Sequence, residues 1–123
     1  MGPESRVLDF GSGIMISFDD FAKLEIKTGK ILTCEKVVGS DNLFKVTVDL
    51  AEDKPRQLVV GLAKHYSPEQ LVGKGVVVLT NLQPRVIRGI ESQGMLLAAE
   101  DGTGKTIALL TPDKEIQAGS KVR

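Results

Sequence analysis

Hydrophobic and polar residues alternate most regularly between residues 44 and 50. Phe44, Val46, Val48 and Leu50 are separated there by single polar residues. A period of two is typical of a β-strand with one buried face, because successive side chains point to opposite sides of a sheet. We therefore expect a half-buried strand in this segment.

A second alternating pattern runs from Leu24 to Val37, and Gly29 interrupts it. Glycine inside a strand pattern marks a bulge, a sharp bend or a close approach of another backbone. The segment therefore predicts a strand with an irregularity at Gly29. A cluster of turn residues at 39–42 ends it.

Capping residues predict two short helices. Ser17 is followed by two aspartates, which favour a helix start because the N-terminal end of the helix dipole is positive. We expect this helix at residues 18–23. Ser67 is followed by proline and, three residues on, by glutamine, which is the pattern of a capping box. Gly73 is expected to end that second helix.

Several short apolar runs complete the pattern and are expected to be strands; they cover residues 57–61, 76–79, 86–87, 95–99 and 106–110. Short strands separated by turns, with only two brief helices, predict an all-β fold in the form of a small closed barrel. Residues 1–14 contain Gly-Ser-Gly and show no periodicity, so we interpret them as a tag or linker. The domain is then expected to cover residues 15–123.

Composition narrows the class of protein. The 123 residues contain 41% hydrophobic and 26% charged residues, which is typical of a globular domain. No apolar run approaches the ~18 residues of a membrane span, and no signal peptide is recognisable. One cysteine and one histidine are too few for a zinc site built from cysteine and histidine ligands, and neither a metal nor a cofactor is expected. These features favour a soluble, cytoplasmic protein that does not bind membranes.

The charges are balanced overall but unevenly placed. Sixteen basic residues match sixteen acidic ones, yet residues 54–90 carry six basic residues against Glu69 alone. Such a segment either forms a positive surface for a polyanion or consists of solvated strand and loop faces.

The residues that suggest catalysis lack the necessary context. Residues 102–106 read GTGKT, like the end of a phosphate-binding loop, but Ala99 stands where the full motif needs glycine, and a strand pattern follows instead of a helix. A glycine-rich hairpin turn explains this stretch better. His65 has no recognisable nucleophile and acid partner, so a hydrolase is the weakest hypothesis. Cys34 lies in a strand pattern and is expected to be a buried, unreactive thiol.

The stretch from Asn81 to Ala99 is the strongest candidate for a binding site. Arg85 and Arg88 lie close together, followed by the hydrogen-bonding side chains of Ser92 and Gln93. Such a loop offers charge to phosphates and polar groups to riboses. A structural hairpin with solvated arginines is the alternative.

Two long stretches of the chain, residues 16–50 and 56–101, resemble one family. The most specific motifs are Asn81-Leu82, Pro84-Arg85, Arg88-Gly89 and Ser92-Gln93-Gly94-Met95. They resemble the tRNA-binding domain found in methionyl-tRNA synthetase, in free-standing structure-specific tRNA-binding proteins, in a small secretion chaperone and in a eukaryotic cytokine domain. The resemblance extends from Ile16 to the C-terminus.

This resemblance implies a five-stranded OB-fold barrel with added terminal elements that hold a homodimer. It also implies recognition of the tRNA elbow by shape. By position, Ser92 and Met95 match residues that contact tRNA in the family. The other expected tRNA-binding residues are Arg85, Arg88 and Gln93, which lie in the same loop, and Lys64, which precedes the second short helix. Two positions depart from the family pattern: Asn42 stands where a lysine is common, and Ala51 where a glycine is common.

The aromatic content agrees with recognition by shape. Binding of single strands by OB folds relies on exposed aromatic rings, and we expect only Tyr66 to be available for stacking. We therefore predict sequence-nonspecific tRNA binding by a non-catalytic domain, appended to or partnered with a methionyl-tRNA synthetase catalytic domain. A dimeric chaperone-like module that binds unfolded protein is the alternative.

Overall fold

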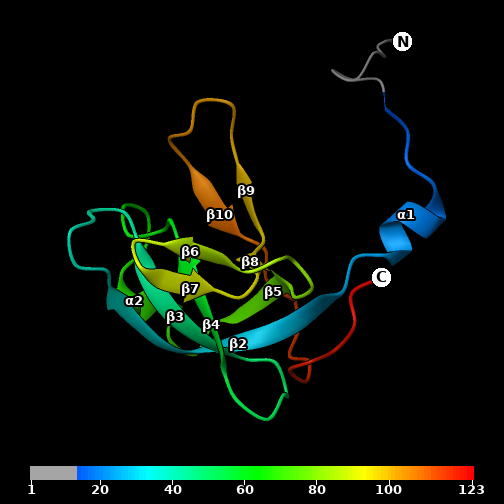
Figure 1. Ribbon diagram of the computed structural model, residues 1–123, viewed down its shortest axis with the longest axis horizontal. Coiled ribbons are helices and arrows are strands. Elements are labelled where there is room, and N and C mark those ends of the chain that lie inside the picture. The colour runs from blue at the N-terminus through cyan, green and yellow to red at the C-terminus, as the bar shows by residue number, and fades with distance from the viewer. Residues whose placement is uncertain (1–13) are drawn as a thin grey trace.

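The computed structural model describes residues 14–123, which form an antiparallel barrel with short added elements (Figure 1). In chain order the elements are α1 (Phe18–Ala22), β2 (Ile26–Lys36), β3 (Phe44–Asp49), β4 (Arg56–Val60), α2 (Pro68–Leu71), β5 (Gly75–Leu79), β6 (Arg85–Ile87), β7 (Ile90–Ser92), β8 (Met95–Leu96), β9 (Ala98–Glu100) and β10 (Ile107–Leu109). The predicted leader, residues 1–14, lies outside the described residues except for Ile14. No helix within residues 14–123 has the length and apolar character needed to cross a membrane.

The five strands of the main sheet follow the order β4-β3-β2-β5-β8, and every pair is antiparallel. The long strand β2 makes the barrel possible, because its first half pairs with β5 and its second half pairs with β3. Between β4 and β8, the ring is completed by a hydrogen bond in which the Gln93 amide donates to the Gln57 carbonyl (2.9 Å). The predicted five-stranded barrel is confirmed.

The core lies inside this barrel. Phe44, Val46 and Val48 of β3 are all buried, and their polar neighbours are only partly so, as the alternation predicts. The inward faces of the other strands contribute Ile31, Leu58, Val76, Val78 and Leu96.

Gly29 allows the barrel to close tightly. A Cβ atom at this position would lie 2.7 Å from Val48 Cγ1 and 2.9 Å from Leu50 Cδ2. The register of β2 against β3 shifts between Ile31 and Thr33, two residues after the predicted position. Gly29 thus permits close approach, while the bulge itself lies further along the strand.

Both predicted helix starts are present. Ser17 and Asp20 form a reciprocal capping box at α1, and Ser67 and Gln70 form another at α2. Helix α1 ends one residue earlier than predicted. Each helix is so short that its cap supplies much of its local order.

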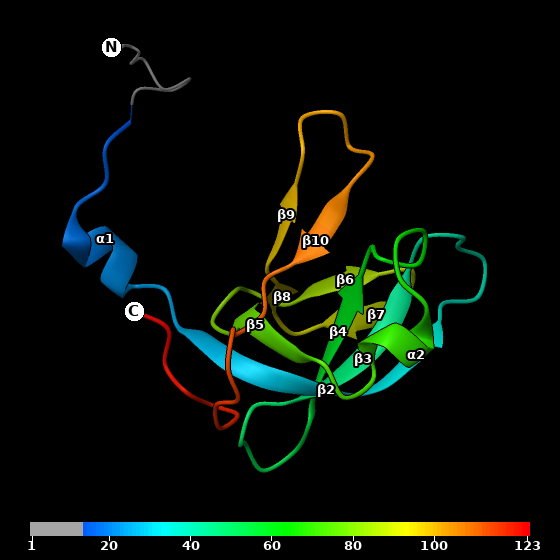
Figure 2. The same cartoon turned by 180° about the vertical axis from the view of Figure 1, so that it is seen from behind.

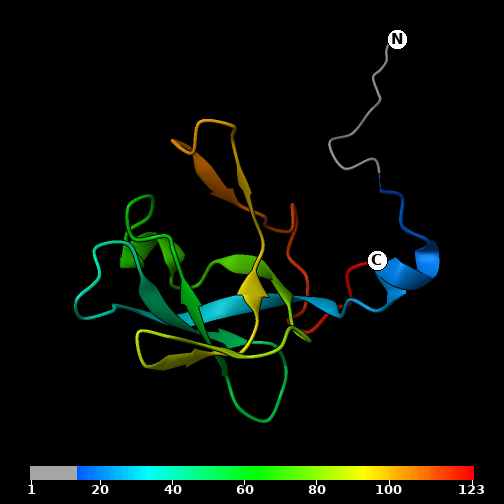
Figure 3. The ribbon, with the colours of Figure 1, turned by 45° about the horizontal axis from the view of Figure 1, so that its top comes forward.

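Two small hairpins project from the main sheet. Strands β6 and β7 form the first, and β9 and β10 form the second, which rises from the barrel in Figure 3. The apolar run at 95–99 is therefore divided between β8 and β9, not a single strand as predicted. The chain leaves the barrel at Leu97, whose amide still donates to Val77 of β5 (2.9 Å).

The C-terminal segment is anchored along β2. The buried Thr28 hydroxyl donates to the Gln117 carbonyl (2.9 Å) and accepts from the Ser120 amide (3.1 Å). Figure 2 shows α1 and the C-terminus at the same end of the molecule, with α1 standing away from the barrel.

Candidate nucleic-acid interface

The β6–β7 hairpin presents two arginines to solvent. Arg85 begins β6, and Arg88 is the first residue of the two-residue turn between Ile87 and Ile90. Arg88 and Gly89 have φ values of 54° and 78°, as a type I′ turn requires. Among residues 14–123, neither guanidinium has an ion-pair or hydrogen-bond partner. Both charges are therefore available to an external anion.

The turn between β2 and β3 brings Arg88 and Lys64 into one neighbourhood. A Cβ atom at Gly39 in this turn would lie 3.6 Å from Arg88 Nη1. In the same turn, the Asp41 carboxylate lies 3.8 Å from Lys64 Nζ, and both side chains are largely exposed. An exposed pair at this distance is weak and exchangeable, so an RNA phosphate can compete for the ammonium.

Asn42, where the family commonly has lysine, has a structural role in this turn. Its carbonyl accepts from the Ala63 amide (3.0 Å), and its Oδ1 accepts from the Lys64 amide (3.4 Å). The turn is thereby fastened to the segment after β4. The substitution removes one positive charge but helps to hold Lys64 in place.

Ser92 lies at the right place but is only 5% exposed. Its hydroxyl accepts from the Val59 amide (3.0 Å) and donates to the Gly94 carbonyl (3.3 Å). In this structure the hydroxyl therefore fastens β7 to β4. The prediction that Ser92 itself contacts tRNA stays a prediction, and so do the roles of the other five residues.

Gln93 also connects parts of the interface. Its side-chain amide donates to Glu91 Oε1 (3.0 Å), and its backbone amide donates to the Gln57 carbonyl of β4 (2.9 Å). Its side chain is partly exposed beside the hairpin.

Sequence analysis did not identify the residue that holds this hairpin in place, Arg56. Its Nη1 donates to the Gln93 carbonyl (3.1 Å) and to the Thr80 carbonyl, and its Nε and Nη2 contact the two oxygens of Glu52 (3.2 and 2.6 Å). One guanidinium thus ties the hairpin to the end of β5 and to the β3–β4 turn. The spacing of Glu52 and Arg56, four residues apart, could have suggested their ion pair. It could not have revealed that Arg56 also donates to the distant carbonyls of Thr80 and Gln93.

A pocket of about 280 Å³ lies where the β9–β10 hairpin meets the barrel. Its walls combine aliphatic and polar groups, and Arg85, Ser92 and Met95 are among its lining residues. Three of the six predicted site residues therefore share one concavity. Lys64 and Arg88 do not line this pocket; their side chains lie near the β2–β3 turn instead.

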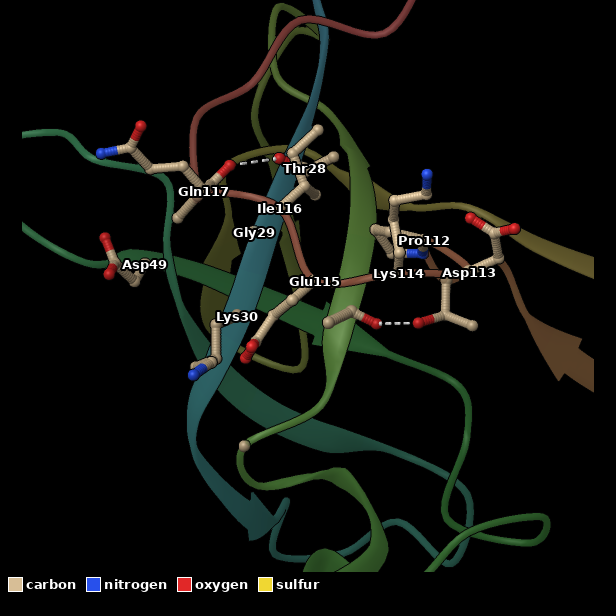
Figure 4. Close-up of a pocket in the computed structure, with 14 residues that line it drawn as sticks. Thr28, Gly29, Lys30, Asp49, Pro112, Asp113, Lys114, Glu115, Ile116 and Gln117 are labelled. Atoms are coloured by element: carbon tan, nitrogen blue, oxygen red, sulfur yellow. Dashed lines mark hydrogen bonds between the residues drawn. The ribbon is translucent and has the colours of Figure 1, made fainter.

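A larger hollow of about 780 Å³ lies between β2 and the C-terminal segment (Figure 4). Its charged lining residues are Lys30, Lys114, Asp49, Asp113 and Glu115. Acidic groups outnumber basic ones there, so this hollow suits a polyanion less well than the arginine hairpin does.

The remaining chemical candidates have structural explanations. GTGKT forms the turn between β9 and β10, as predicted for a hairpin. The Thr103 hydroxyl donates to Asp101 (2.8 Å), and this bond, with backbone N–H groups of the turn, lowers the pKa of the Asp101 carboxyl. Burial, followed by the charges of Glu35 and Glu69, raises the pKa of the Cys34 thiol to about 11, which makes it unreactive.

Tyr66 corrects one expectation. Instead of offering a free stacking surface, its ring packs against the core, and its hydroxyl accepts from the Leu109 amide (3.1 Å). Tyr66 supports β10 and is partly buried, so its ring is not a freely exposed stacking surface. Within residues 14–123 no group of three or more potential metal ligands is assembled.

A small antiparallel barrel with a hairpin whose two arginines are unpaired among residues 14–123 has the features expected of a nucleic-acid-binding β-barrel domain. Residues 26–121 match the family model described as "Putative tRNA binding domain". The chain belongs to this tRNA-binding domain family.

Known relatives agree with this assignment. The chain is 54% identical over 109 residues to the methionine–tRNA ligase of Methanosarcina mazei. The aligned region covers 89% of this chain and 15% of the ligase. The chain thus spans about a seventh of the length of the curated ligases it matches.

Solved structures show the same barrel. The MetRS related protein of Pyrococcus horikoshii matches with a TM-score of 0.83 and 34% identity, covering 89% of this chain and 99% of that one. The chaperone CsaA of Bacillus anthracis matches with a TM-score of 0.80 and 26% identity, covering 89% and 100%.

Proposed function

We propose that this domain binds tRNA by its shape, without reading its sequence, and delivers it to a methionyl-tRNA synthetase catalytic domain. The observation that supports the proposal most directly is the pair of arginines on the β6–β7 hairpin, which have no partner among residues 14–123. Arginine recognises phosphate through a rigid, bidentate set of donors, and phosphate contacts carry no sequence information.

The surroundings of the hairpin favour folded RNA over a single strand. With Tyr66 bound to β10 and Phe44 buried, the barrel lacks the exposed rings on which successive bases stack. Contacts to phosphates and 2′-hydroxyls across a folded RNA surface need no such rings.

The contribution to catalysis is an increase in local concentration. A domain that is tethered to, or associated with, a synthetase makes capture of the acceptor end effectively intramolecular. The basis for this part of the proposal is the similarity to methionine–tRNA ligases, in which the matched region is 15% of the ligase's length.

The N-terminal segment supports a homodimer. Met15, Ile16 and Phe18 are 88%, 65% and 78% exposed, and they follow one another along a segment that stands away from the barrel. A contiguous apolar surface of this kind favours burial against a partner. Phe18→Asp is expected to convert a dimer to a monomer in analytical ultracentrifugation, and a wild-type monomer at all concentrations would contradict dimerisation.

The salt dependence of tRNA affinity tests the binding function. The logarithm of affinity should fall linearly with the logarithm of salt concentration, by roughly 0.7–0.9 per neutralised phosphate. Replacing both Arg85 and Arg88 by alanine should lower the magnitude of that slope by roughly 1.4–1.8. Lys54→Ala, which removes a charge from the exposed β3–β4 turn, is the matched control. An identical slope in the double variant and wild type would exclude the hairpin as the phosphate site.

Binding of unfolded protein is a second candidate function. The apolar pocket and the 26% identity to a CsaA chaperone favour it. It predicts association with a permanently unfolded polypeptide that persists at high salt and is not displaced by tRNA. Loss of that association on adding tRNA would place both ligands on one surface.

A further inference from the structure

The aliphatic pocket at the base of the β9–β10 hairpin has properties that phosphate binding does not explain. Val59, Leu62 and Ile107 are among its walls, and none of them can contact a phosphate favourably. Its volume of about 280 Å³ is near the lower end of the ~300–1,000 Å³ range of ligand pockets. The pocket therefore suits one small group that has an apolar face.

The rim of the pocket is polar and positive on one side. Arg85 lines it without an internal partner among residues 14–123. Glu100 is the one acidic lining residue, but its Oε2 lies beside the hairpin turn, 3.1 Å from where a Cβ at Gly104 would be. A ligand with an apolar face and an adjoining anionic group would pack against the aliphatic walls and pair with Arg85.

Met95 completes this arrangement. It is 45% exposed and lies in β8 at the pocket. Its thioether side chain is soft and adaptable, and it makes favourable contacts with aromatic rings. It can provide the contact that exposed aromatic residues make in other barrels.

We propose that this pocket receives one unstacked nucleobase of the bound tRNA, with Met95 against the base and Arg85 on the adjoining phosphate. The inference rests on the proposed tRNA-binding function. An apolar peptide side chain would fill the same walls but would leave Arg85 without an anion, so the charge at the rim favours a nucleotide. Insertion of an apolar-faced base without hydrogen-bond reading is also compatible with sequence-tolerant binding.

Two neighbouring alanines provide the test. Ala98 lines the pocket, whereas Ala99 does not, because successive residues of β9 point to opposite sides. Both are exposed, so a phenylalanine at either position is expected to leave the fold intact. Ala98→Phe should fill the pocket, and Ala99→Phe is its matched control.

The measurement is tRNA affinity by fluorescence anisotropy at several salt concentrations. Ala98→Phe should weaken binding roughly five-fold or more at every salt concentration, with an unchanged salt slope, because it removes a base contact and no charge. Ala99→Phe should bind like wild type. Chemical probing should show one tRNA base protected by the wild type and accessible with Ala98→Phe. Ala98→Leu, a smaller obstruction, replaces Ala98→Phe if the latter unfolds in a thermal melt.

The outcomes separate this inference from the proposed function. Wild-type protein that fails to bind tRNA at low salt would refute the function itself. Normal tRNA binding by wild type, Ala98→Phe and Ala99→Phe alike would refute the base pocket alone. Loss of binding to carboxymethylated unfolded polypeptide in Ala98→Phe, with tRNA affinity unchanged, would assign the pocket to peptide side chains and overturn the proposal.

Discussion

Arg56 is the side chain on which the position of the arginine hairpin depends most directly. Its guanidinium joins Glu52, the Thr80 carbonyl and the Gln93 carbonyl, which come from three different parts of the chain. Arg56→Met keeps most of the aliphatic length and removes every one of these hydrogen bonds. The carbonyls of the buried Thr80 and of Gln93 then lose the donor that Arg56 supplies.

The magnitude follows from these contacts. A hydrogen bond to a charged group contributes ~1.5–3 kcal/mol, and the bonds of one guanidinium are not additive. The side chains of Arg56 and Glu52 are 21% and 32% exposed, so solvent screens part of their attraction. We expect Arg56→Met to lower the free energy of unfolding by ~2–3 kcal/mol, which corresponds to roughly 10 °C in melting temperature for a domain of this size.

Urea and thermal unfolding of Arg56→Met, Glu52→Gln and the double variant measure this effect and the coupling between the two residues. A decrease in the free energy of unfolding below ~0.5 kcal/mol, which is the usual range for surface substitutions, would refute the structural role of Arg56. tRNA affinity adds an independent test. If Arg56 positions the hairpin, Glu52→Gln does not strengthen binding, whereas a direct phosphate contact by Arg56 would be strengthened when the competing carboxylate charge is removed.

Three further predictions concern the barrel. Gly29→Ala should destabilise the protein by ~1–3 kcal/mol in urea unfolding, because its Cβ would lie 2.7 Å from Val48 Cγ1; an unchanged midpoint would contradict this packing. Ala51→Gly should stabilise by ~0.5 kcal/mol, because Ala51 has a φ of 62° and relief of left-handed strain exceeds the entropy cost of glycine; a lower midpoint would refute this. Cys34 should react slowly with iodoacetamide at pH 8 and faster toward its pKa of about 11, whereas urea-unfolded protein should react readily; equal rates would contradict burial. Because folding raises this pKa, the associated stability is complete below the pKa of the unfolded thiol and is lost as the pH rises toward 11.

Local patterns accounted for much of the architecture. The alternation between Phe44 and Leu50 became β3 with its inward face buried, and the predicted capping box at Ser67 formed. The predicted N-cap at Ser17 also formed, and Asp20 extends it to a second capping box. These features depend on residues within a few positions of each other, so their physical causes are present in a short segment. The division of residues 95–99 into two strands was not predictable in this way, because it depends on where the chain leaves β5.

The candidate site shows the same division. The motifs from Asn81 to Met95 led to the hairpin and to its arginines, whose exposure and free charge the structure displays. They did not reveal that Ser92 is buried, or that Tyr66 supports the second hairpin through Leu109, 43 residues away. A hydroxyl in a sequence looks equally available whether it faces solvent or another strand.

The order of polar and apolar residues alone was sufficient to determine that this protein is a small barrel of short strands, since side-chain periodicity decides which face of each strand avoids water. The resemblance of its motifs was sufficient to identify the family. Only the tertiary structure decided which charges remain free within the described part of the chain. Arg56 is held by carbonyls 24 and 37 residues away, whereas Arg85 and Arg88 are exposed and have no partner among residues 14–123. Those partners meet only when the barrel closes, and the distances between charges, not their order along the chain, set the energy of their interaction.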